Sequence, residues 1–233
     1  MRDSSAASPL LALKSVGYAH AKHRALLDDI SLAVRRGERL SLTGPNGCGK
    51  STLLSIVATV LRPSRGQILF EGRDVMKQLK PYRQQMSFTA ATAGGFYPRL
   101  SAIENIEIFS LLRGNRYSRP AIARLLDEVE LARSATNRYF HEFSTGMRQR
   151  LQIARAFLEP TALILLDEPT IGLDAAGLAM LDRMIRARED AAFIIVSHDA
   201  EFHARHQTGR YEIRPPAAEL REARGIREIL EAA

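Results

Sequence analysis

The chain has 233 residues, of which 45% are hydrophobic and 25% charged, as is typical of a globular protein with a full hydrophobic core. Its single cysteine excludes a disulfide bond within the chain, and no apolar run approaches the roughly 20 residues needed to span a bilayer. The formal net charge of +7 is compatible with an ordinary basic surface, with contact to anionic lipid, or with nucleic acid. The basic residues are dispersed and there is no tryptophan, so nucleic acid is the least favoured partner. We expect a cytoplasmic protein whose membrane role, if any, requires a partner.

The first third of the chain is predicted to be rich in strands. Alternating or apolar runs bounded by turns predict strands over Leu10–His20, Leu32–Val34, Arg39–Thr43 and Gln67–Phe70. A helix with an apolar face is predicted over Lys50–Leu61. A further strand is predicted over Gln85–Ala90.

The middle of the chain is predicted to be helical. Ser101–Leu112 has helical spacing, and Ser101 with Glu104 forms a capping-box pattern. Two further helices are predicted over Ser118–Leu131 and Arg148–Leu158. We interpret residues 95–159 as an inserted helical subdomain.

The last third returns to an α/β pattern. Ala162–Leu166 and Ala192–Ser197 are continuous apolar runs, typical of buried parallel strands, with a crossover helix predicted over Ala175–Arg188. Residues 10–90 and 160–214 would then form one core, and residues 215–233 a C-terminal helix. We predict an α/β fold in which residues 1–233 form a single domain.

A phosphate-binding loop is the most specific motif in the chain. The segment fits G-x-x-x-x-G-K-[ST] between a predicted strand and a helix N-terminus, where backbone N–H groups and the helix dipole attract phosphate. Lys50 can reach the β- and γ-phosphates, and the Ser51 hydroxyl can ligate Mg²⁺. We therefore predict that ATP is bound by Gly44, Pro45, Asn46, Gly47, Cys48, Gly49, Lys50, Ser51 and Thr52.

Polar residues follow both apolar strands of the last third. Asp167 and Glu168 end the run ALILLDEP, where Asp167 suits the Mg²⁺ site and Glu168 suits a general base for the attacking water. His198 follows the next strand. Because parallel strands end at one edge of the sheet, we expect His198 to contact the γ-phosphate.

A second anion site is predicted before the helix that begins near Arg148. The run Phe143-Ser144-Thr145-Gly146-Met147 offers hydroxyl and backbone donors at a helix N-terminus. Since one nucleotide needs only one phosphate loop, this second donor set makes sense if it serves the nucleotide of another copy.

These motifs together resemble those of the ATP-binding subunit of an ABC transporter. The phosphate loop, FSTGM, LILLDEP, IGLD at Ile171–Asp174 and VSHD at Val196–Asp199 occur in the family's order, over about residues 10–199. The resemblance implies a P-loop ATPase fold of ABC type, with a mixed sheet core, an antiparallel β region and an inserted helical subdomain. It also places Tyr18 against the adenine, although a strand aromatic packed into the core remains the alternative.

The resemblance further implies a head-to-tail dimer, with an identical or a different second subunit. Each ATP would lie between one subunit's phosphate loop and the other's Ser144, Thr145, Gly146 and Met147, and Asp174 would couple the two sites. The cycle of ATP binding and hydrolysis would drive a separate membrane permease at the inner face of the cell membrane. The alternative is an ABC-type ATPase that acts on a protein machine or nucleic acid.

The chain departs from the family pattern at two motifs. Ala91 or Thr92 stands where the family has a glutamine that touches Mg²⁺ and the attacking water. The run STGM differs from the commoner signature by Thr145 and Met147, and resembles that of exporters with a separate permease. We expect slower hydrolysis or altered coupling, with ATP binding retained, in an exporter subunit.

Overall fold

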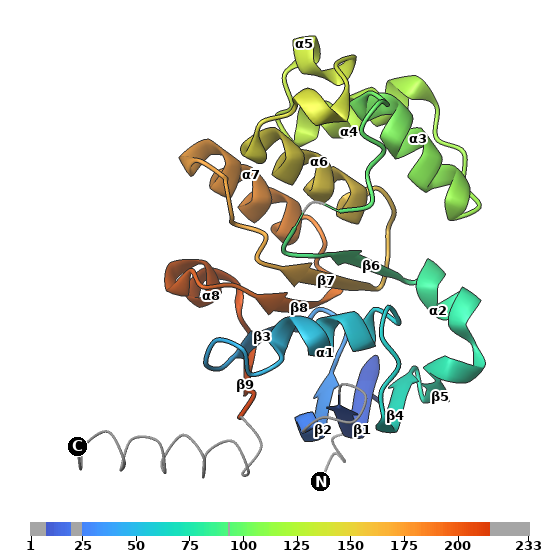
Figure 1. Ribbon diagram of the computed structural model, residues 1–233, viewed down its shortest axis with the longest axis vertical. Helices are drawn as coiled ribbons and strands as arrows, with labels where there is room; N and C mark the ends of the chain where they lie inside the picture. Colours follow the sequence, from blue (N-terminus) through green and yellow to red (C-terminus); the bar gives the residue numbers. More distant parts are fainter. Residues whose placement is uncertain (1–7, 20–24, 93, 215–233) are drawn as a thin grey trace, which may run out of the picture.

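The computed structural model describes residues 8–19, 25–92 and 94–214 of the chain. Strands form two separate sheets, with helices between and around them (Figure 1). The predicted C-terminal helix over 215–233 lies outside the described residues. Among the residues that the structure describes, no helix has the length and apolar character needed to cross a membrane.

A four-stranded antiparallel sheet is built from the first third of the chain. Its strand order is β2-β1-β4-β5. The bounds are β1 Leu11–Ala19, β2 Ala25–Val34, β4 Arg65–Phe70 and β5 Arg73–Asp74.

A five-stranded parallel sheet forms the centre of the molecule, in the order β6-β7-β8-β3-β9. The strands are β3 Arg39–Thr43, β6 Met86–Thr89, β7 Leu163–Asp167, β8 Ala192–Val196 and β9 Gly209–Glu212. Every residue of β7 and β8 is buried, as continuous apolar runs predict for strands covered on both faces.

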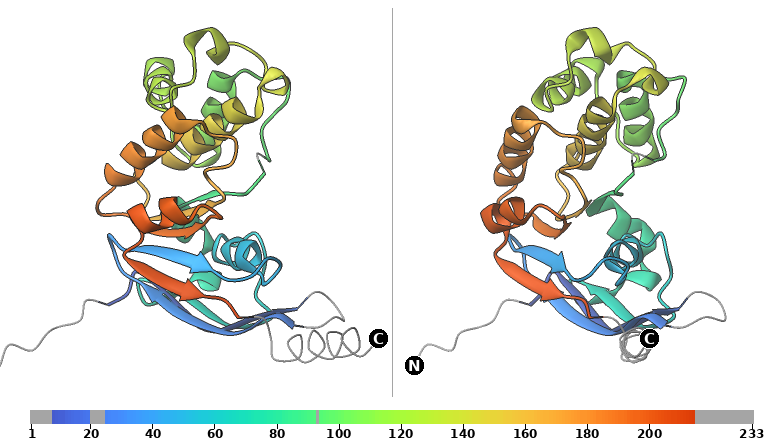
Figure 2. Two further views of the ribbon diagram at one scale, coloured as in Figure 1. Left: turned by 90° about the vertical axis from the view of Figure 1, so that its left-hand side faces the viewer. Right: turned by 60° about the vertical axis from the view of Figure 1, so that its left-hand side comes forward.

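The helices cover the two faces of the parallel sheet unequally. Figure 2 shows α1 on one side of this sheet, and on the other side α6 and α7, with α3, α4 and α5 beyond them. The helices are α1 Lys50–Val57, α2 Leu79–Gln84, α3 Ala102–Leu112, α4 Arg119–Glu128, α5 Arg133–Thr136, α6 Thr145–Phe157, α7 Ala175–Arg186 and α8 Ala200–His206. Two 3₁₀ turns occupy Val75–Lys77 and Phe140–Glu142.

The hydrophobic interior is divided into two clusters by the parallel sheet. Leu163 and Leu165 of β7 pack with the antiparallel sheet and α1, whereas Ile164 and Leu166 pack with the helices on the opposite face. This alternation follows from the two-residue period of a strand. The parallel sheet is therefore the common wall of both interiors and fixes where its strand ends lie.

Most expected elements are present, and the differences have local causes. The apolar pattern predicts a strand only over Leu32–Val34, whereas β2 begins at Ala25. Asp28 and Asp29 interrupt the pattern, and Asp29 has a positive φ of 53° where the pairing with β1 is irregular. The helix expected over Lys50–Leu61 ends at Val57, because Thr59 adopts a left-handed conformation at a φ of 57°.

The predicted helix over Arg148–Leu158 begins earlier, at Thr145. Ser144 is its N-cap, and its side chain accepts a hydrogen bond from the Met147 N–H. The short α8 and β9 are not predicted from the sequence. Four-residue β9 depends on parallel pairing with β3, which is distant in sequence, and no local pattern indicates it.

The capping box of α3 gives a stability prediction. Ser101 Oγ accepts from the Glu104 N–H at 3.3 Å, and the Glu104 carboxylate accepts from the Ser101 N–H at 2.8 Å. Ser101→Ala should lower the free energy of unfolding by about 1 kcal/mol, measured by urea denaturation. Ser118→Ala at the exposed N-cap of α4, where the bond is 3.4 Å, is the matched comparison and should cost less. Equal or reversed costs would contradict this account of the box.

Candidate functional site

The loop between β3 and α1 is built around an inward-pointing lysine. Lys50 is buried, and its ammonium Nζ donates to the Gly44 carbonyl at 2.9 Å and the Pro45 carbonyl at 3.0 Å. Gly49 is the N-cap of α1 and has no side chain to occupy the first N–H groups of the helix. The loop therefore presents a cation and free backbone donors, which suits a phosphate group.

Two glycines of this loop are required by close approach. Both have a positive φ, 142° at Gly44 and 98° at Gly49. A Cβ at Gly44 would lie 2.5 Å from the Ile213 carbonyl oxygen, and one at Gly49 would lie 2.6 Å from Leu27. Any side chain at either position would displace the loop from β9 or β2.

The hydroxyl of Ser51 and the carboxylate of Asp167 meet across the space between α1 and β7. Ser51 Oγ donates to Asp167 Oδ1 at 3.1 Å, and the Ala91 N–H also hydrogen bonds to this carboxylate. Asp167 is 3% exposed. Burial raises the pKa of Asp167, the neighbouring Glu168 raises it further, and the bond from Ser51 opposes this shift. A cation bound at this carboxylate, in addition to the Lys50 ammonium, would relieve the cost of burying the charge of Asp167.

Glu168 and His198 form a pair at the ends of β7 and β8. Glu168 Oε2 accepts from the His198 backbone N–H at 3.1 Å, and His198 Nε2 lies 3.4 Å from Glu168 Oε1. Glu168 adopts a left-handed backbone with a φ of 50°, stabilised by its N–H donating to the Val196 carbonyl at 2.8 Å. A non-glycine residue in this conformation is strained, and such strain is concentrated at functional sites.

A cleft of about 320 Å³ unites these groups. Lys50, Ser51, Glu168 and His198 line it together with Leu26, Asn46, Gly47, Gly49, Thr52 and Val196. Leu26 is not predicted from the sequence, because a wall residue of this kind carries no motif, whereas Val196 begins the VSHD motif. The structure therefore brings together most of the predicted phosphate loop with Glu168 and His198.

Asp167, Cys48 and Tyr18, which are also predicted site residues, do not line the cleft. Cys48 is 3% exposed and packs in the first hydrophobic cluster. Tyr18 is half-buried on β1 and packs against the first hydrophobic cluster. It does not line the cleft, and its contact with adenine stays a prediction.

The FSTGM segment lies elsewhere in the same chain. None of Ser144, Thr145, Gly146 or Met147 lines the cleft. They begin α6, which lies on the opposite face of the parallel sheet from α1 (Figure 1). A Cβ at Gly146 would lie 2.9 Å from the Gly172 carbonyl oxygen, so this segment packs tightly on the IGLD loop.

Asp174 caps α7 and belongs to a charged network. Its carboxylate Oδ1 accepts from the Gly177 N–H at 2.8 Å and from Arg150 at 2.9 Å. The Gly177 bond, followed by the charge of Arg150, lowers the pKa of Asp174. Arg150 also pairs with Glu130 at 3.0 Å, and Glu130 with Arg183 at 2.6 Å. The network fixes the IGLD loop to the helical layer.

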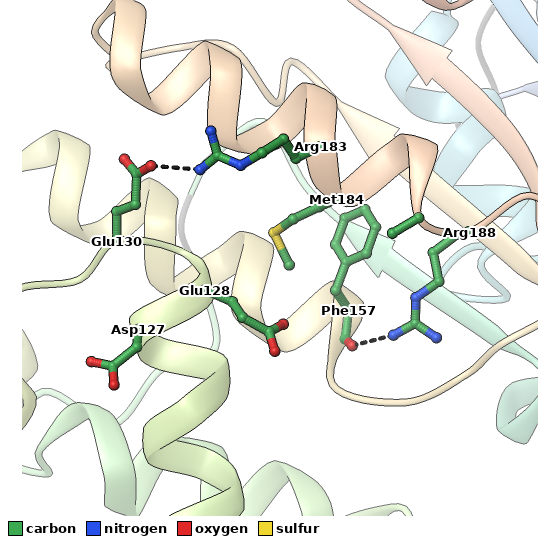
Figure 3. A pocket seen from close by; sticks show the side chains of 8 residues that line it. Asp127, Glu128, Glu130, Phe157, Arg183, Met184 and Arg188 are labelled. Atoms are coloured by element: carbon green, nitrogen blue, oxygen red, sulfur yellow. Dashed lines mark hydrogen bonds and ion pairs between the residues drawn. The ribbon is translucent and has the colours of Figure 1, made fainter.

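A second hollow, of about 340 Å³, lies beside this network (Figure 3). Its walls come from α4, α6 and α7, with Phe157 and Met184 between carboxylates and arginines. Arg188 donates to the Phe157 carbonyl at 2.8 Å, and Arg183 is engaged by Glu130. This hollow shares no lining residue with the phosphate-loop cleft.

The oxygen atoms at the cleft fit a magnesium–nucleotide complex. The described residues contain no cluster of three or more His, Cys, Asp or Glu side chains that could hold a metal by themselves. Mg²⁺ does not need one, because proteins bind it through one or two oxygens together with substrate phosphates and water. The Ser51–Asp167 pair beside Lys50 supplies that type of donor set.

The raised pKa of Asp167 gives a prediction for the protein without ligands. Folding raises the pKa of Asp167. The folded protein therefore loses stability as the pH rises from the pKa of this group in the unfolded chain toward its pKa in the folded protein. Asp167→Asn removes the buried charge. It should therefore raise the melting temperature at pH 7 relative to the unsubstituted protein, and the difference should shrink at acidic pH, as measured by calorimetry. A lower melting temperature of Asp167→Asn at pH 7 would contradict this account.

Comparison with known proteins identifies the family. The sequence profile described as ABC transporter matches residues 27–171. The chain is 38% identical to the probable iron export ATP-binding protein FetA of Escherichia coli (strain K12), over 93% of the chain and 96% of the relative. It is 36% identical to the ABC transporter ATP-binding protein NatA of Bacillus subtilis (strain 168), over 74% of the chain and 72% of the relative.

Solved structures agree with the sequence comparison. The ATP-binding subunit of an ABC transporter superimposes with a TM-score of 0.79 at 26% identity and 94% coverage of each chain. A dimeric post-hydrolysis state of the ATP-binding cassette MJ0796, bound to ADP and Pi, gives a TM-score of 0.77 at 25% identity, covering 88% of this chain and 94% of that one. Together with the phosphate loop and the carboxylates beside it, these similarities show that the chain belongs to the ABC transporter family and is an ATP-hydrolysing subunit of that family.

Proposed function

We propose that this subunit is the motor of an exporter, hydrolysing Mg²⁺-ATP between two copies of the cassette to drive a separate membrane permease. The observation that carries the proposal is the cleft in which Lys50 and Ser51 meet the Glu168–His198 pair, with Asp167 hydrogen bonded to Ser51. Each of these groups has the chemistry that one part of ATP hydrolysis requires.

The phosphate loop and Asp167 provide binding. The Lys50 ammonium and the N–H groups of α1 would hold the β- and γ-phosphates, while Ser51 and Asp167 would hold Mg²⁺. The metal, when bound, neutralises charge that develops on the phosphate oxygens. Breaking the Ser51–Asp167 hydrogen bond leaves both oxygens free to face the ion.

Glu168 provides the proton acceptor for the attacking water. It is 8% exposed, and its side chain is oriented by the His198 N–H and by the His198 ring. The strained backbone of Glu168 directs the carboxylate into the cleft, which it lines together with His198. His198 would contact the γ-phosphate and keep Glu168 in place.

A second copy would complete the nucleotide site. Ser144 and Gly146 lie on the far side of the parallel sheet from α1, so the same chain does not present them to its own phosphate loop. The dimer of MJ0796 provides a precedent for pairing. Ile171 is 47% exposed in the loop between Glu168 and Asp174, and an apolar side chain there suits a subunit contact.

The permease would dock beside the end of α3. Leu111 and Leu112 are 52% and 72% exposed there, and Leu112 borders a hollow of about 220 Å³ with Phe88, Phe109 and Leu158. Arg113 and Arg155 also line this hollow, and exposed leucines next to a hollow of mixed character suit a short amphipathic segment of a partner protein.

The share of each relative's length that the chain matches favours export over import. The iron export protein FetA aligns over 96% of its length. The spermidine/putrescine import protein PotA of Chromobacterium violaceum is 37% identical, but the match covers only 53% of its length. The chain therefore resembles the export protein over nearly the whole of that relative, which favours export.

Glu168→Gln tests the hydrolytic site. The variant should bind ATP like the unsubstituted protein but hydrolyse it at least about 100-fold more slowly, because the amide cannot accept the proton. Phosphate release and a labelled-ATP binding assay measure the two effects. With ATP and Mg²⁺ the variant should accumulate as a dimer in size-exclusion chromatography.

Glu201→Gln, an exposed carboxylate on α8, is the control and should retain full turnover. Turnover by Glu168→Gln within a few-fold of the unsubstituted rate would remove Glu168 from its proposed role. If Glu168→Gln turns over slowly but forms no dimer, Glu168 keeps its role as the general base and the proposal of a site shared by two copies is contradicted.

Leu112→Glu tests the permease surface. A charge at this exposed position should abolish co-purification of an integral membrane protein with the tagged chain, while ATP binding by the isolated subunit stays unchanged. Leu79→Glu, at a leucine of α2 that is 36% exposed, is the matched control and should preserve co-purification. Retention of the membrane partner by Leu112→Glu would exclude this surface.

A further inference from the structure

Three side chains form a stripe along α6 that reaches the edge of the nucleotide site. Gln149, Gln152 and Arg155 follow one another at three-residue spacing, which places them on one face of a helix. Gln149 donates to the Pro169 carbonyl at 2.9 Å, directly after Glu168. The other two contact the segment that follows β6, residues 90–92 and 94–100, called the β6–α3 loop.

The β6–α3 loop leaves the sheet beside Asp167. β6 pairs in parallel with β7, with Thr89 opposite Leu166, so Ala90 is the next residue along that ladder. The Ala91 N–H stabilises the charged form of the Asp167 carboxylate and so lowers the pKa of that group. A main-chain donor therefore acts on this carboxylate at a position where the side chain of Ala91 offers no polar group.

The Gln152 side chain holds the start of this loop. It is fully buried, and its amide Nε2 donates to the Ala90 carbonyl. Its Oε1 is buried without a hydrogen-bond partner among the described residues. A buried amide that is only half satisfied is costly compared with an apolar side chain of the same shape, so packing does not explain a glutamine at this position.

Arg155 holds the loop a few residues further on. Its Nη1 donates to the Gly94 carbonyl at 3.1 Å, and its guanidinium lies 4.8 Å from the Phe96 ring centroid and 4.9 Å from that of Phe109. Burial lowers the pKa of this guanidinium. The stacked, hydrogen-bonded arginine fixes the loop to α3 and α6 together.

We propose that Gln152 and Arg155 are positioning residues, which hold the β6–α3 loop so that the Ala91 N–H orients Asp167 toward Mg²⁺. Ser144 is the N-cap of the same helix, so a movement of α6 on pairing of two copies would be transmitted to Asp167. The inference rests on the proposed role of Asp167 as a metal ligand.

Gln152→Met is the decisive variant. Methionine has a similar length and no polar atom to leave unpaired, so the melting temperature should stay the same or rise. Binding of mant-ATP is measured in the Glu168→Gln background, where hydrolysis is slow. The free Mg²⁺ concentration that gives half of the maximal tightening of this binding should rise about tenfold. Binding of mant-ATP without Mg²⁺ should not change. Hydrogen–deuterium exchange of the peptide containing Ala91 should become faster.

Arg188→Met is the matched control. It removes a side-chain bond to the Phe157 carbonyl at the other end of α6, at 2.8 Å, and should alter neither the Mg²⁺ dependence nor the exchange of the β6–α3 loop. Arg155→Lys, which keeps the charge but not the stacked plane, should reproduce the Gln152→Met effects.

Asp167→Asn distinguishes the metal role of Asp167 from the positioning role of Gln152. If Asp167→Asn leaves the Mg²⁺ dependence of binding intact, the metal role of Asp167 fails and with it the proposed site. If Asp167→Asn abolishes that dependence while Gln152→Met leaves both the Mg²⁺ dependence and the loop exchange unchanged, the positioning role is wrong and Gln152 is a packing residue.

Discussion

The parallel pairing of β7 with β8 is the constraint on which the nucleotide site depends. Asp167 at the end of β7 lies opposite Val196 at the end of β8, so the residues after both strands emerge at one edge. The Glu168 N–H then reaches the Val196 carbonyl, and the Glu168 carboxylate reaches the His198 N–H. β3 pairs with β8 on its other side and delivers the phosphate loop to the same edge.

This edge also explains the unusual electrostatics of the site. Two adjacent carboxylates, Asp167 and Glu168, are both buried, and burial with mutual repulsion raises the pKa of Asp167. Such an arrangement is unfavourable in the empty protein and becomes favourable only when positive charge arrives. The two buried carboxylates therefore lower the stability of the folded protein, a cost that positive charge bound beside them would relieve.

Helix α6 connects this edge to the rest of the helical layer. Its first turn packs on the IGLD loop through Gly146 and Gly172, and Gln149 further along reaches Pro169. Arg150 joins the same helix to Asp174 and Glu130. One helix therefore carries Gly146 against the IGLD loop and contacts both Pro169, directly after Glu168, and Ala90, at the start of the β6–α3 loop.

Much of the fold and of the candidate site is predictable from the sequence, because the sequence motifs coincide with the ends of strands. Arg39–Thr43 forms β3 with the predicted bounds, and the cleft assembles Lys50, Ser51, Glu168 and His198 as the order of motifs predicts. The buried glutamine at position 152 was not predicted, since its partner is a backbone carbonyl 62 residues away. β9 is not predictable from local pattern because pairing with the distant β3 specifies it, whereas the first part of β2 is hidden by Asp28 and Asp29, which interrupt its apolar pattern.

The central claim is that a complete nucleotide site needs two copies of this cassette. A crystal structure of the Glu168→Gln variant with ATP and Mg²⁺ tests it most directly. The account predicts a head-to-tail dimer in which the γ-phosphate held by Lys50 of one copy lies within hydrogen-bond distance of Ser144 from the other. ATP enclosed by a single copy, with Ser144 of both copies remote from any phosphate, would contradict the account.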